Sequence, residues 1–230
     1  MEDIINKYDL FVFDLDDTLV KTEKYHYMAW LFILKQEFGD AFTMTYNEYI
    51  SRFHSNKHDH VKTYLLNNLG LTDSENIIYR KNTYYIDLLK QNETSLQVVN
   101  GAQDFLKMIV NYNKKFVIVS NSSKTNVDYF TALFPILQMS SKNYYREMMI
   151  HKKPHPECYL NVINDYPNIR VVGFEDSITG IHAMSQVPDI DVSFINTENY
   201  YYYNDIIKIY SPKYVFNDYT TLQMIDQTEI

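Results

Sequence analysis

The sequence predicts an α/β protein whose parallel sheet is interrupted by an all-helical insert. After Gly101, short apolar runs rich in β-branched and aromatic residues alternate with amphipathic helical patterns. An earlier run of the same kind, residues 10–13, is separated from the others by a long stretch of helical pattern with no convincing strand. Alternating strands and helices imply a parallel sheet covered by helices on both faces. We therefore predict an α/β core formed by residues 1–20 and 95–230, with a helical cap domain at 21–94.

The helical insert divides into segments that end at glycines or begin at capping residues. Residues 23–38 are apolar nearly all round, which predicts a buried helix that ends before Gly39. Asn56 is placed to cap a helix over 58–68 that Gly70 ends. Thr72 and Glu75 have capping-box spacing and are expected to open a long helix that runs past Leu89.

The core segment predicts the remaining elements in a regular order. The expected helices and strands are helix 102–112, strand 116–119, helix 124–134, a weak strand near Leu137, helix 155–163, strand 171–174, helix 178–184, strand 192–195 and a short apolar segment at 214–216.

Composition excludes several classes of partner. A formal charge of −8 and a pI near 5.3 argue against nucleic acid or an anionic membrane as a partner. The single cysteine, Cys158, excludes an internal disulfide and fits a reducing compartment. No apolar run is long enough to span a membrane or to serve as a secretory signal, so we expect an intracellular, cytoplasmic monomer. The run Tyr200–Tyr203 is interpreted as a surface loop or helix start, since few cations accompany it.

The most informative motif follows the first predicted strand. Asp14, Asp16 and Thr18 come directly after residues 10–13. In an open parallel sheet, ligands bind at the carboxyl ends of the strands. Carboxylates and a hydroxyl at this edge suit Mg²⁺ and phosphate, and one carboxylate could act as a nucleophile.

Three further motifs follow in order along the chain. Ser120 and Asn121 end the next strand, Lys153 precedes a Pro-x-Pro helix entry, and Glu175 and Asp176 end a third strand. Together with the Asp-x-Asp-x-Thr motif, this series resembles the haloacid dehalogenase-like (HAD) hydrolases over nearly the whole chain. The resemblance implies a Rossmann-like core with a parallel sheet flanked by helices, and a small helical cap inserted after the first strand.

The resemblance also implies roles for these residues. Asp14 is expected to attack phosphorus and form an aspartyl-phosphate, while Asp16 acts as general acid and base. The carboxylates and the phosphate require balancing charge, which Mg²⁺ and the catalytic Lys153 are expected to supply. Asp17 stands where many relatives have glycine, and we expect it to offer only its backbone N–H. The expected metal ligands are Asp14, Asp16, Glu175 and Asp176, and the expected phosphate contacts are Thr18, Ser120 and Asn121.

The insert carries the substrate clues. Thr22 and His26 follow the nucleophile with a spacing similar to that of β-phosphoglucomutases and several sugar-phosphate phosphatases, and Lys81 and Asn82 resemble a substrate-contacting segment of the mutase cap. These four residues are expected to contact the substrate; the alternatives are a solvated helix lysine for Lys81 and a helix-surface histidine near a hinge for His26. The cluster at 51–60 is interpreted as a solvated basic loop, although His54 and His58 have a spacing that could bind a transition metal on a helix.

The resulting hypothesis is Mg²⁺-dependent hydrolysis of a small phosphomonoester such as a sugar phosphate. Asp16, Glu175 and Asp176 argue against 2-haloacid dehalogenation, which needs neither a second acid/base carboxylate nor a metal. The alternatives are a β-phosphoglucomutase-type phosphomutase, a nucleotidase and a non-catalytic regulator that binds a phosphorylated metabolite.

Overall fold

The computed structural model describes residues 2–54, 58–197 and 203–220. The chain forms two compact units, one made of Met1–Lys21 with Gln97–Ile230 and the other of Thr22–Leu96. We call the first the core unit and the second the cap unit, and describe each by itself.

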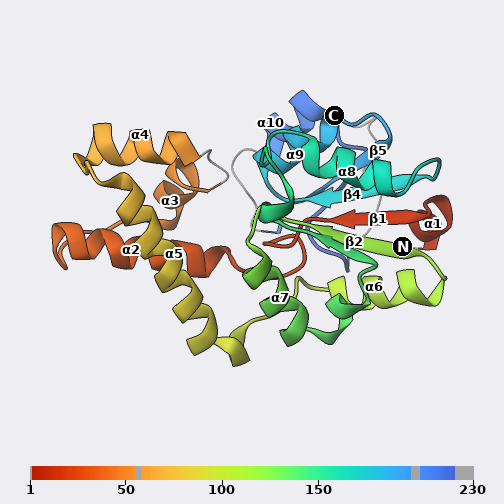
Figure 1. Ribbon diagram of the computed structural model, residues 1–230, viewed down its shortest axis with the longest axis horizontal. Coiled ribbons are helices and arrows are strands. Elements are labelled where there is room, and N and C mark those ends of the chain that lie inside the picture. Colours follow the sequence, from red (N-terminus) through yellow and green to blue (C-terminus); the bar gives the residue numbers. More distant parts are fainter. Residues whose placement is uncertain (1, 55–57, 198–202, 221–230) are drawn as a thin grey trace. The chain divides into compact units, whose positions relative to one another are not determined.

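The core unit is built on a six-stranded sheet in which every paired neighbour is parallel, as the sequence predicts. In Figure 1, β1, β2 and β4 lie side by side with their arrows pointing the same way. The strand order is β3-β2-β1-β4-β5-β6, so the first strand lies in the middle of the sheet. The strands are β1 Leu10–Phe13, β2 Lys115–Val119, β3 Lys142–Tyr144, β4 Val171–Glu175, β5 Ile190–Ile195 and β6 Tyr214–Phe216.

Helices cover both faces of this sheet because successive strand residues point to opposite sides. Leu10 and Val12 pack in a cluster with residues of two helices that follow Lys153. Phe11 and Phe13 pack against Phe105 on the other face. The helices of this unit are α1 Glu2–Lys7, α6 Ala102–Asn111, α7 Lys124–Leu133, α8 Glu157–Asp165, α9 Ile178–Ser185 and α10 Tyr203–Tyr210, with 3₁₀ turns η2 Pro135–Met139 and η3 Arg146–Met148.

The weak strand expected near Leu137 is wrong. Leu137 is buried in η2, and the edge strand β3 begins at Lys142. Pro135 opens the 3₁₀ turn, and proline at a turn start favours a helical conformation over a sheet ladder that needs its N–H. The apolar character of Leu137 therefore reflects burial in this turn and not a strand.

The cap unit is all-helical over its described residues. Its helices are α2 Glu23–Phe38, α3 Tyr46–Arg52, α4 His58–Leu69 and α5 Ser74–Gln91, followed by the 3₁₀ turn η1 Glu93–Ser95. The helix α3 was not assigned from the sequence, although Thr45 and Glu48 form a full capping box at its start. The N-cap of α5 is Asp73, which accepts from the backbone N–H of Asn76, so the expectation of Thr72 is wrong. The proposed cap residue Asn56 lies outside the described residues.

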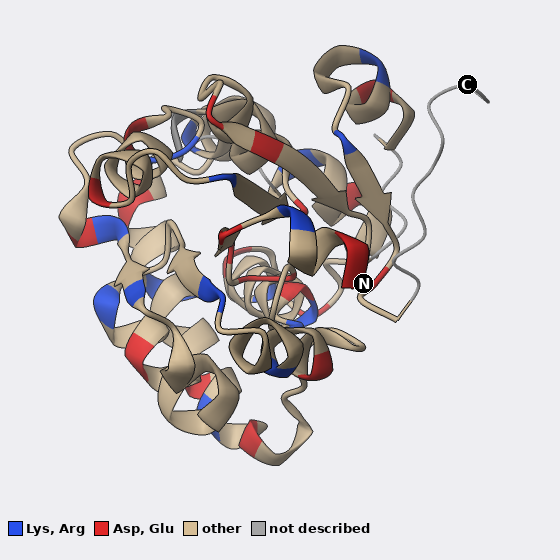
Figure 2. Cartoon of the chain, turned by 90° about the vertical axis from the view of Figure 1, so that its right-hand side faces the viewer, with Lys and Arg blue, Asp and Glu red and all other residues tan. Residues whose placement is uncertain are grey.

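Charge is distributed without segregation along the described ribbon. Figure 2 shows Lys and Arg segments interspersed with Asp and Glu segments. No helix in the described part of the chain is long and apolar enough to cross a membrane. Of the tyrosine run, only Tyr203 is described, and it is the first residue of α10.

Candidate active site

Three carboxylates meet at the carboxyl ends of β1 and β4, as the parallel pairing of these neighbouring strands requires. Asp14, Glu175 and Asp176 are all buried, and each offers an oxygen within 4.8 Å of the others. Oxygen donors at this spacing are the ligands that a hard divalent cation prefers. The Lys153 ammonium pairs with two of these acids, so the buried cluster carries excess negative charge. The donor set and its charge therefore fit a cation such as Mg²⁺.

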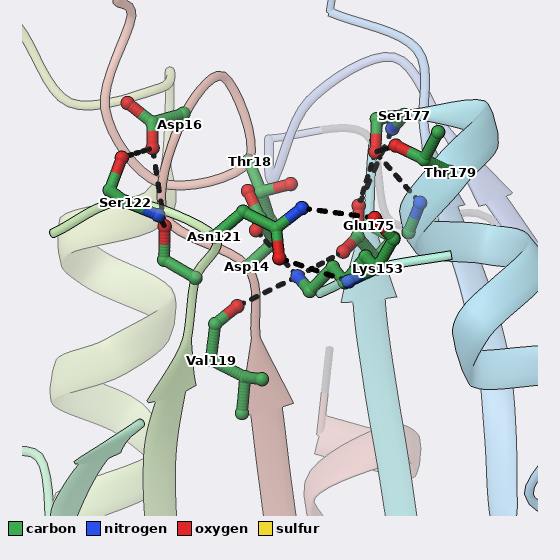
Figure 3. Close-up of polar contacts among 12 residues, drawn as sticks. Asp14, Asp16, Thr18, Val119, Asn121, Ser122, Lys153, Glu175, Ser177 and Thr179 are labelled. Carbon is green, nitrogen blue, oxygen red and sulfur yellow. Dashed lines mark hydrogen bonds and ion pairs between the residues drawn. The ribbon is translucent and has the colours of Figure 1, made fainter. Parts of the chain in front are cut away.

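Lys153 is fixed by three acceptors, one for each ammonium proton. Its Nζ lies 2.7 Å from Asp14 Oδ1, 2.8 Å from the Val119 carbonyl oxygen and 2.5 Å from Glu175 Oε1 (Figure 3). Burial lowers the pKa of Lys153, but the carboxylates of Asp14 and Glu175 outweigh it and raise the pKa above its ordinary value. The lysine is therefore a fixed positive charge beside Asp14.

Asp14 shows the complementary effect. Burial raises its pKa well above the ordinary value, Lys153 opposes the rise, and the neighbouring carboxylates of Glu175, Asp176 and Asp16 add to it. Additional positive charge at this position would favour the ionised form of Asp14. The electrostatics of the cluster therefore fit a bound cation.

Asp16 points elsewhere. Its Oδ2 accepts from Ser122 Oγ at 2.8 Å and from Ser120 Oγ at 3.3 Å. Figure 3 shows its carboxylate directed toward Ser122 and away from Lys153. The same Ser120 hydroxyl that was expected to contact phosphate is thus donated to Asp16.

The other predicted phosphate contacts are held by the motifs themselves. Thr18 Oγ1 donates to Asp176 Oδ1 at 2.9 Å. The amide of Asn121 brackets Lys153, accepting from its backbone N–H at 3.1 Å and donating to its carbonyl at 3.3 Å. These contacts orient the Asp176 carboxylate and the loop that carries Lys153. Their role toward phosphate stays a prediction.

Asp17 has a positive φ of 55°, a conformation that glycine adopts without strain and that aspartate tolerates better than most residues. This explains how an aspartate can stand where relatives have glycine. Its backbone N–H donates to the Val20 carbonyl at 2.7 Å and closes the loop after β1. The backbone N–H of Asp17 is thus used within the loop itself.

No role was predicted from the sequence for the residues around Glu175, although Ser177 and Gly180 belong to the motif that contains it. Its Oε1 accepts from the Tyr159 hydroxyl at 2.6 Å, and its Oε2 accepts from the Ser177 hydroxyl at 3.1 Å. Ser177 is also the N-cap of α9, which a serine just before a helix could have signalled. A Cβ at Gly180 would lie 2.0 Å from the Glu175 carboxyl carbon, so only glycine leaves room for this carboxylate.

The four predicted substrate contacts of the cap unit have different environments. Lys81 is buried on α5, with its Nζ 2.6 Å from His26 Nδ1 and 5.1 Å from the Tyr85 ring centroid. Because an ammonium only donates, Nδ1 is the acceptor and the neutral ring carries its proton on Nε2. Thr22 is buried before α2, whereas Asn82 is exposed. Substrate contact by these residues stays a prediction.

His54 is not part of a solvated loop. It is buried at the end of α3, and its Nδ1 lies 3.0 Å from Glu23 Oε1. The Tyr49 hydroxyl donates to the same carboxylate oxygen. The pKa of Glu23 falls to about 2 because the His54 ring and the hydrogen bonds outweigh burial, which acts in the opposite direction. The side chain of His58 lies outside the described set, so the transition-metal alternative stays a prediction.

A parallel sheet with a cluster of carboxylates at its edge is the arrangement that the motifs indicated. The chain belongs to the haloacid dehalogenase-like hydrolase family, whose model matches residues 8–187. No curated protein matches the chain.

Solved structures share the fold at low sequence identity. A HAD hydrolase of family IA, variant 3, from Entamoeba histolytica has a TM-score of 0.76 at 18% identity, over 94% of this chain and 96% of that one. A predicted phosphoglycolate phosphatase from Haemophilus somnus has a TM-score of 0.75 at 16% identity, covering 93% and 95%. A CbbY variant from Rhodobacter sphaeroides in complex with xylulose-(1,5)bisphosphate has a TM-score of 0.72 at 16% identity, covering 94% and 96%.

Proposed function

We propose that this hydrolase is a Mg²⁺-dependent phosphatase that cleaves a small phosphomonoester through an aspartyl-phosphate. The observation that carries the proposal is the buried Asp14 carboxylate, held by Lys153 beside Glu175 and Asp176. A carboxylate fixed in this way is a nucleophile whose approach is set in advance, and the excess negative charge requires a cation before a phosphate can enter.

Asp14 attacks phosphorus, the bond from phosphorus to the leaving oxygen breaks, and a proton goes to that oxygen. Asp16 supplies the proton and later removes one from the water that hydrolyses the aspartyl-phosphate. For this role Asp16 has to turn from Ser122 toward the leaving group. When Asp16 turns, the hydrogen bond from the Ser120 hydroxyl to Asp16 is broken. The single hydroxyl proton of Ser120 is then free to be donated to another acceptor.

Asp14 and Asp176 would hold the cation, with the Asp16 backbone carbonyl and Glu175 as further candidates. When bound, Mg²⁺ supplies positive charge to the phosphoryl oxygens. Thr18 fixes the orientation of Asp176 through its hydroxyl. Lys153 adds a permanent charge beside Asp14, which together with a bound cation would favour the ionised nucleophile.

Sugar phosphates are the substrate class that we propose. The CbbY structure holds a sugar bisphosphate, and the Haemophilus somnus structure is described as a phosphoglycolate phosphatase. In the cap unit, Lys81 and neutral His26 offer an ammonium and a ring N–H, which suit hydroxyl and phosphate groups. Thr22 and Asn82 complete the set that we propose for substrate selection.

The test is a screen of purified protein with Mg²⁺ against sugar phosphates, nucleotides and phosphoglycolate, with Asp14→Asn as the matched inactive control. We expect phosphate release from at least one small ester, and none from the control. Release by Asp14→Asn at the wild-type rate would overturn the proposal.

The role of Asp16 has its own test. Asp16→Asn should slow release of a poor, alkoxide-like leaving group far more than release of p-nitrophenolate, which needs little protonation. Equal losses for the two leaving groups would contradict proton transfer by Asp16.

The same screen separates a phosphatase from a phosphomutase, because both use the same core residues. A mutase would require a sugar bisphosphate for activation and would form isomerised sugar phosphate faster than free phosphate. We expect rapid phosphate release without isomerised sugar.

A further inference from the structure

The carboxylate of Glu175 has donors on both of its oxygens. Oε1 accepts from Lys153 Nζ at 2.5 Å and from Tyr159 Oη at 2.6 Å. Oε2 accepts from the backbone N–H of Ser177 at 3.4 Å and from its hydroxyl at 3.1 Å. An ionised carboxylate has about four lone-pair sites, so these contacts use its accepting capacity.

Tyr159 contacts both members of this ion pair. It lies on α8, fully buried, with its hydroxyl on Glu175 and its ring centroid 5.0 Å from Lys153 Nζ. Burial and then the Glu175 charge raise its pKa well above the ordinary value, so the hydroxyl stays a donor. The ring face attracts the ammonium while the hydroxyl fixes the carboxylate that the ammonium binds.

We propose that Tyr159 is a positioning residue that sets the Lys153–Asp14 pair through Glu175. The inference rests on the proposed function and assigns Glu175 chiefly to the lysine, leaving Asp14 and Asp176 as the main cation ligands. Tyr159 holds Oε1 toward Lys153, Lys153 spends its remaining protons on Asp14 and the Val119 carbonyl, and Asp14 is thereby aimed.

Loss of the hydroxyl should release this chain of contacts. The terminal torsion of a glutamate is soft, so its hydrogen bonds, together with the close packing of Gly180, fix the carboxylate plane. Without the Tyr159 hydroxyl, one lone pair of Glu175 Oε1 has no donor. Glu175 can then turn toward the cation site and draw Lys153 away from Asp14. A nucleophile displaced by a fraction of an ångström loses much of its advantage in rate.

The test compares two tyrosine-to-phenylalanine changes in one hydrophobic core. Tyr159→Phe keeps the ring under Lys153 and removes the hydroxyl. Tyr144→Phe is the matched control, because Tyr144 is equally buried in the same cluster and also donates to a carboxylate, that of Asp165. Both variants lose a hydrogen bond from a buried ring to a carboxylate; that of Tyr159 ends on the buried Glu175 of the candidate site, and that of Tyr144 ends on the partly exposed Asp165.

We expect Tyr159→Phe to lower kcat about ten-fold at saturating Mg²⁺, with KM within about two-fold of wild type. The Kd for Mg²⁺, measured by calorimetry without substrate, should be unchanged or lower. Tyr144→Phe should keep kcat within about two-fold, even if its unfolding midpoint falls as much as that of Tyr159→Phe.

A kcat for Tyr159→Phe equal to that of the control would overturn the inference. So would a ten-fold or greater rise in the Kd for Mg²⁺ with kcat recovered at saturation, which would make Tyr159 a support of the cation site.

The ammonium proton signal of Lys153 in NMR spectra, assigned with Lys153→Met, provides a readout that needs no turnover. It should shift in Tyr159→Phe and stay in place in Tyr144→Phe; an unchanged signal in both contradicts the inference. If the wild-type chain hydrolyses no phosphomonoester, the proposed function fails, and this signal alone decides the role of Tyr159.

Discussion

Each unit of the chain buries charged side chains, but the two balance them differently. In the core unit, Lys153 pairs with Asp14 and Glu175, and Asp176 adds a third buried acid, so acids exceed bases. In the cap unit, Glu23 pairs with His54 and Tyr49, and Lys81 donates to the neutral ring of His26. A buried charge costs several kcal/mol unless it is compensated. In the cap unit the Glu23 carboxylate has partners within the fold and Lys81 donates to a neutral ring. In the core unit three acids stand against one lysine, and a bound cation would balance this excess of negative charge, which sets the candidate active site apart from the cap contacts.

The largest expected effect comes from removing the nucleophile. Asp14→Asn should reduce turnover by about four orders of magnitude or more, since loss of an attacking group removes the covalent route. Its thermal stability should equal or exceed that of wild type without Mg²⁺, because the change relieves repulsion with Glu175 and Asp176. Asp9→Asn, at the opposite end of β1 and paired with Arg170 on the surface, is the control and should keep full activity. Wild-type activity in Asp14→Asn would contradict the assignment of the carboxylate cluster as the active site.

Withdrawal of the cation should have the next largest effect. EDTA should abolish turnover and Mg²⁺ should restore it, with Ca²⁺ a poor substitute because it tolerates looser coordination. Mg²⁺ at a hundred times its Kd should stabilise the wild-type chain by about 2.7 kcal/mol against unfolding. Asp176→Asn should lose most of this stabilisation in the same thermal assay. Full activity in EDTA would contradict the assignment of the excess charge to a cation.

Crowding Glu175 should have an intermediate effect. Gly180→Ala places a Cβ 2.0 Å from the carboxylate oxygen Oε1, so Glu175 has to move and Lys153 with it. We expect kcat to fall roughly ten- to a hundred-fold and stability by about 1–3 kcal/mol. Gly173→Ala is the matched control, because its Cβ meets the flexible end of Met184 in the core. It should lower the unfolding midpoint with little change in kcat, and the comparison fails if the two variants lose kcat equally.

The smallest expected effect is the acid sensitivity of the cap unit. Burial, and then the Lys81 charge, lower the pKa of His26 from its usual 6.5 to about 3. Between these pH values the unfolded chain binds a proton that the folded chain does not. The free energy of unfolding therefore decreases as the pH is lowered, by at most about 1.4 kcal/mol per pH unit. Glu23, whose pKa falls from 4.5 to about 2, adds a similar loss of stability below about pH 4.5.

The single tryptophan, Trp30, lies beside Lys81 and reports unfolding of the cap unit in urea. His26→Gln retains an acceptor for Lys81 but does not titrate, so its midpoint should be flat between pH 6.5 and 5. Equal slopes for wild type and variant would show that His26 is already charged in the fold.

The fold class was predictable because its signals are local and repeated. Each inner strand is a short apolar run that ends at a polar residue, and the motif order identified the family to which the chain belongs. The misses have specific causes. Leu137 shows apolar character that burial in a 3₁₀ turn explains as well as a strand does, and His54 shows no sequence sign that Glu23, far away in sequence, would bury it.

The residues of the candidate site also differ in how far the sequence could predict them. Residues that end strands, such as Asp14 and Glu175, can be placed from the sequence because the sheet brings strand ends together. Tyr159 could not be recognised, since its neighbours Cys158 and Val162 on α8 make it indistinguishable from an ordinary core aromatic. Only its three-dimensional contact with Glu175 separates it from them.

The most direct test is to locate the phosphoryl group during turnover. The wild-type chain is mixed with Mg²⁺ and the best ester from the screen, quenched rapidly in acid, digested and analysed by mass spectrometry. We predict a phosphoryl mass increment on the peptide containing Asp14, localised to that side chain and absent from Asp14→Asn. A phosphoryl group on any other residue, or rapid hydrolysis with no covalent adduct at any quench time, would contradict the assignment of Asp14 as the nucleophile.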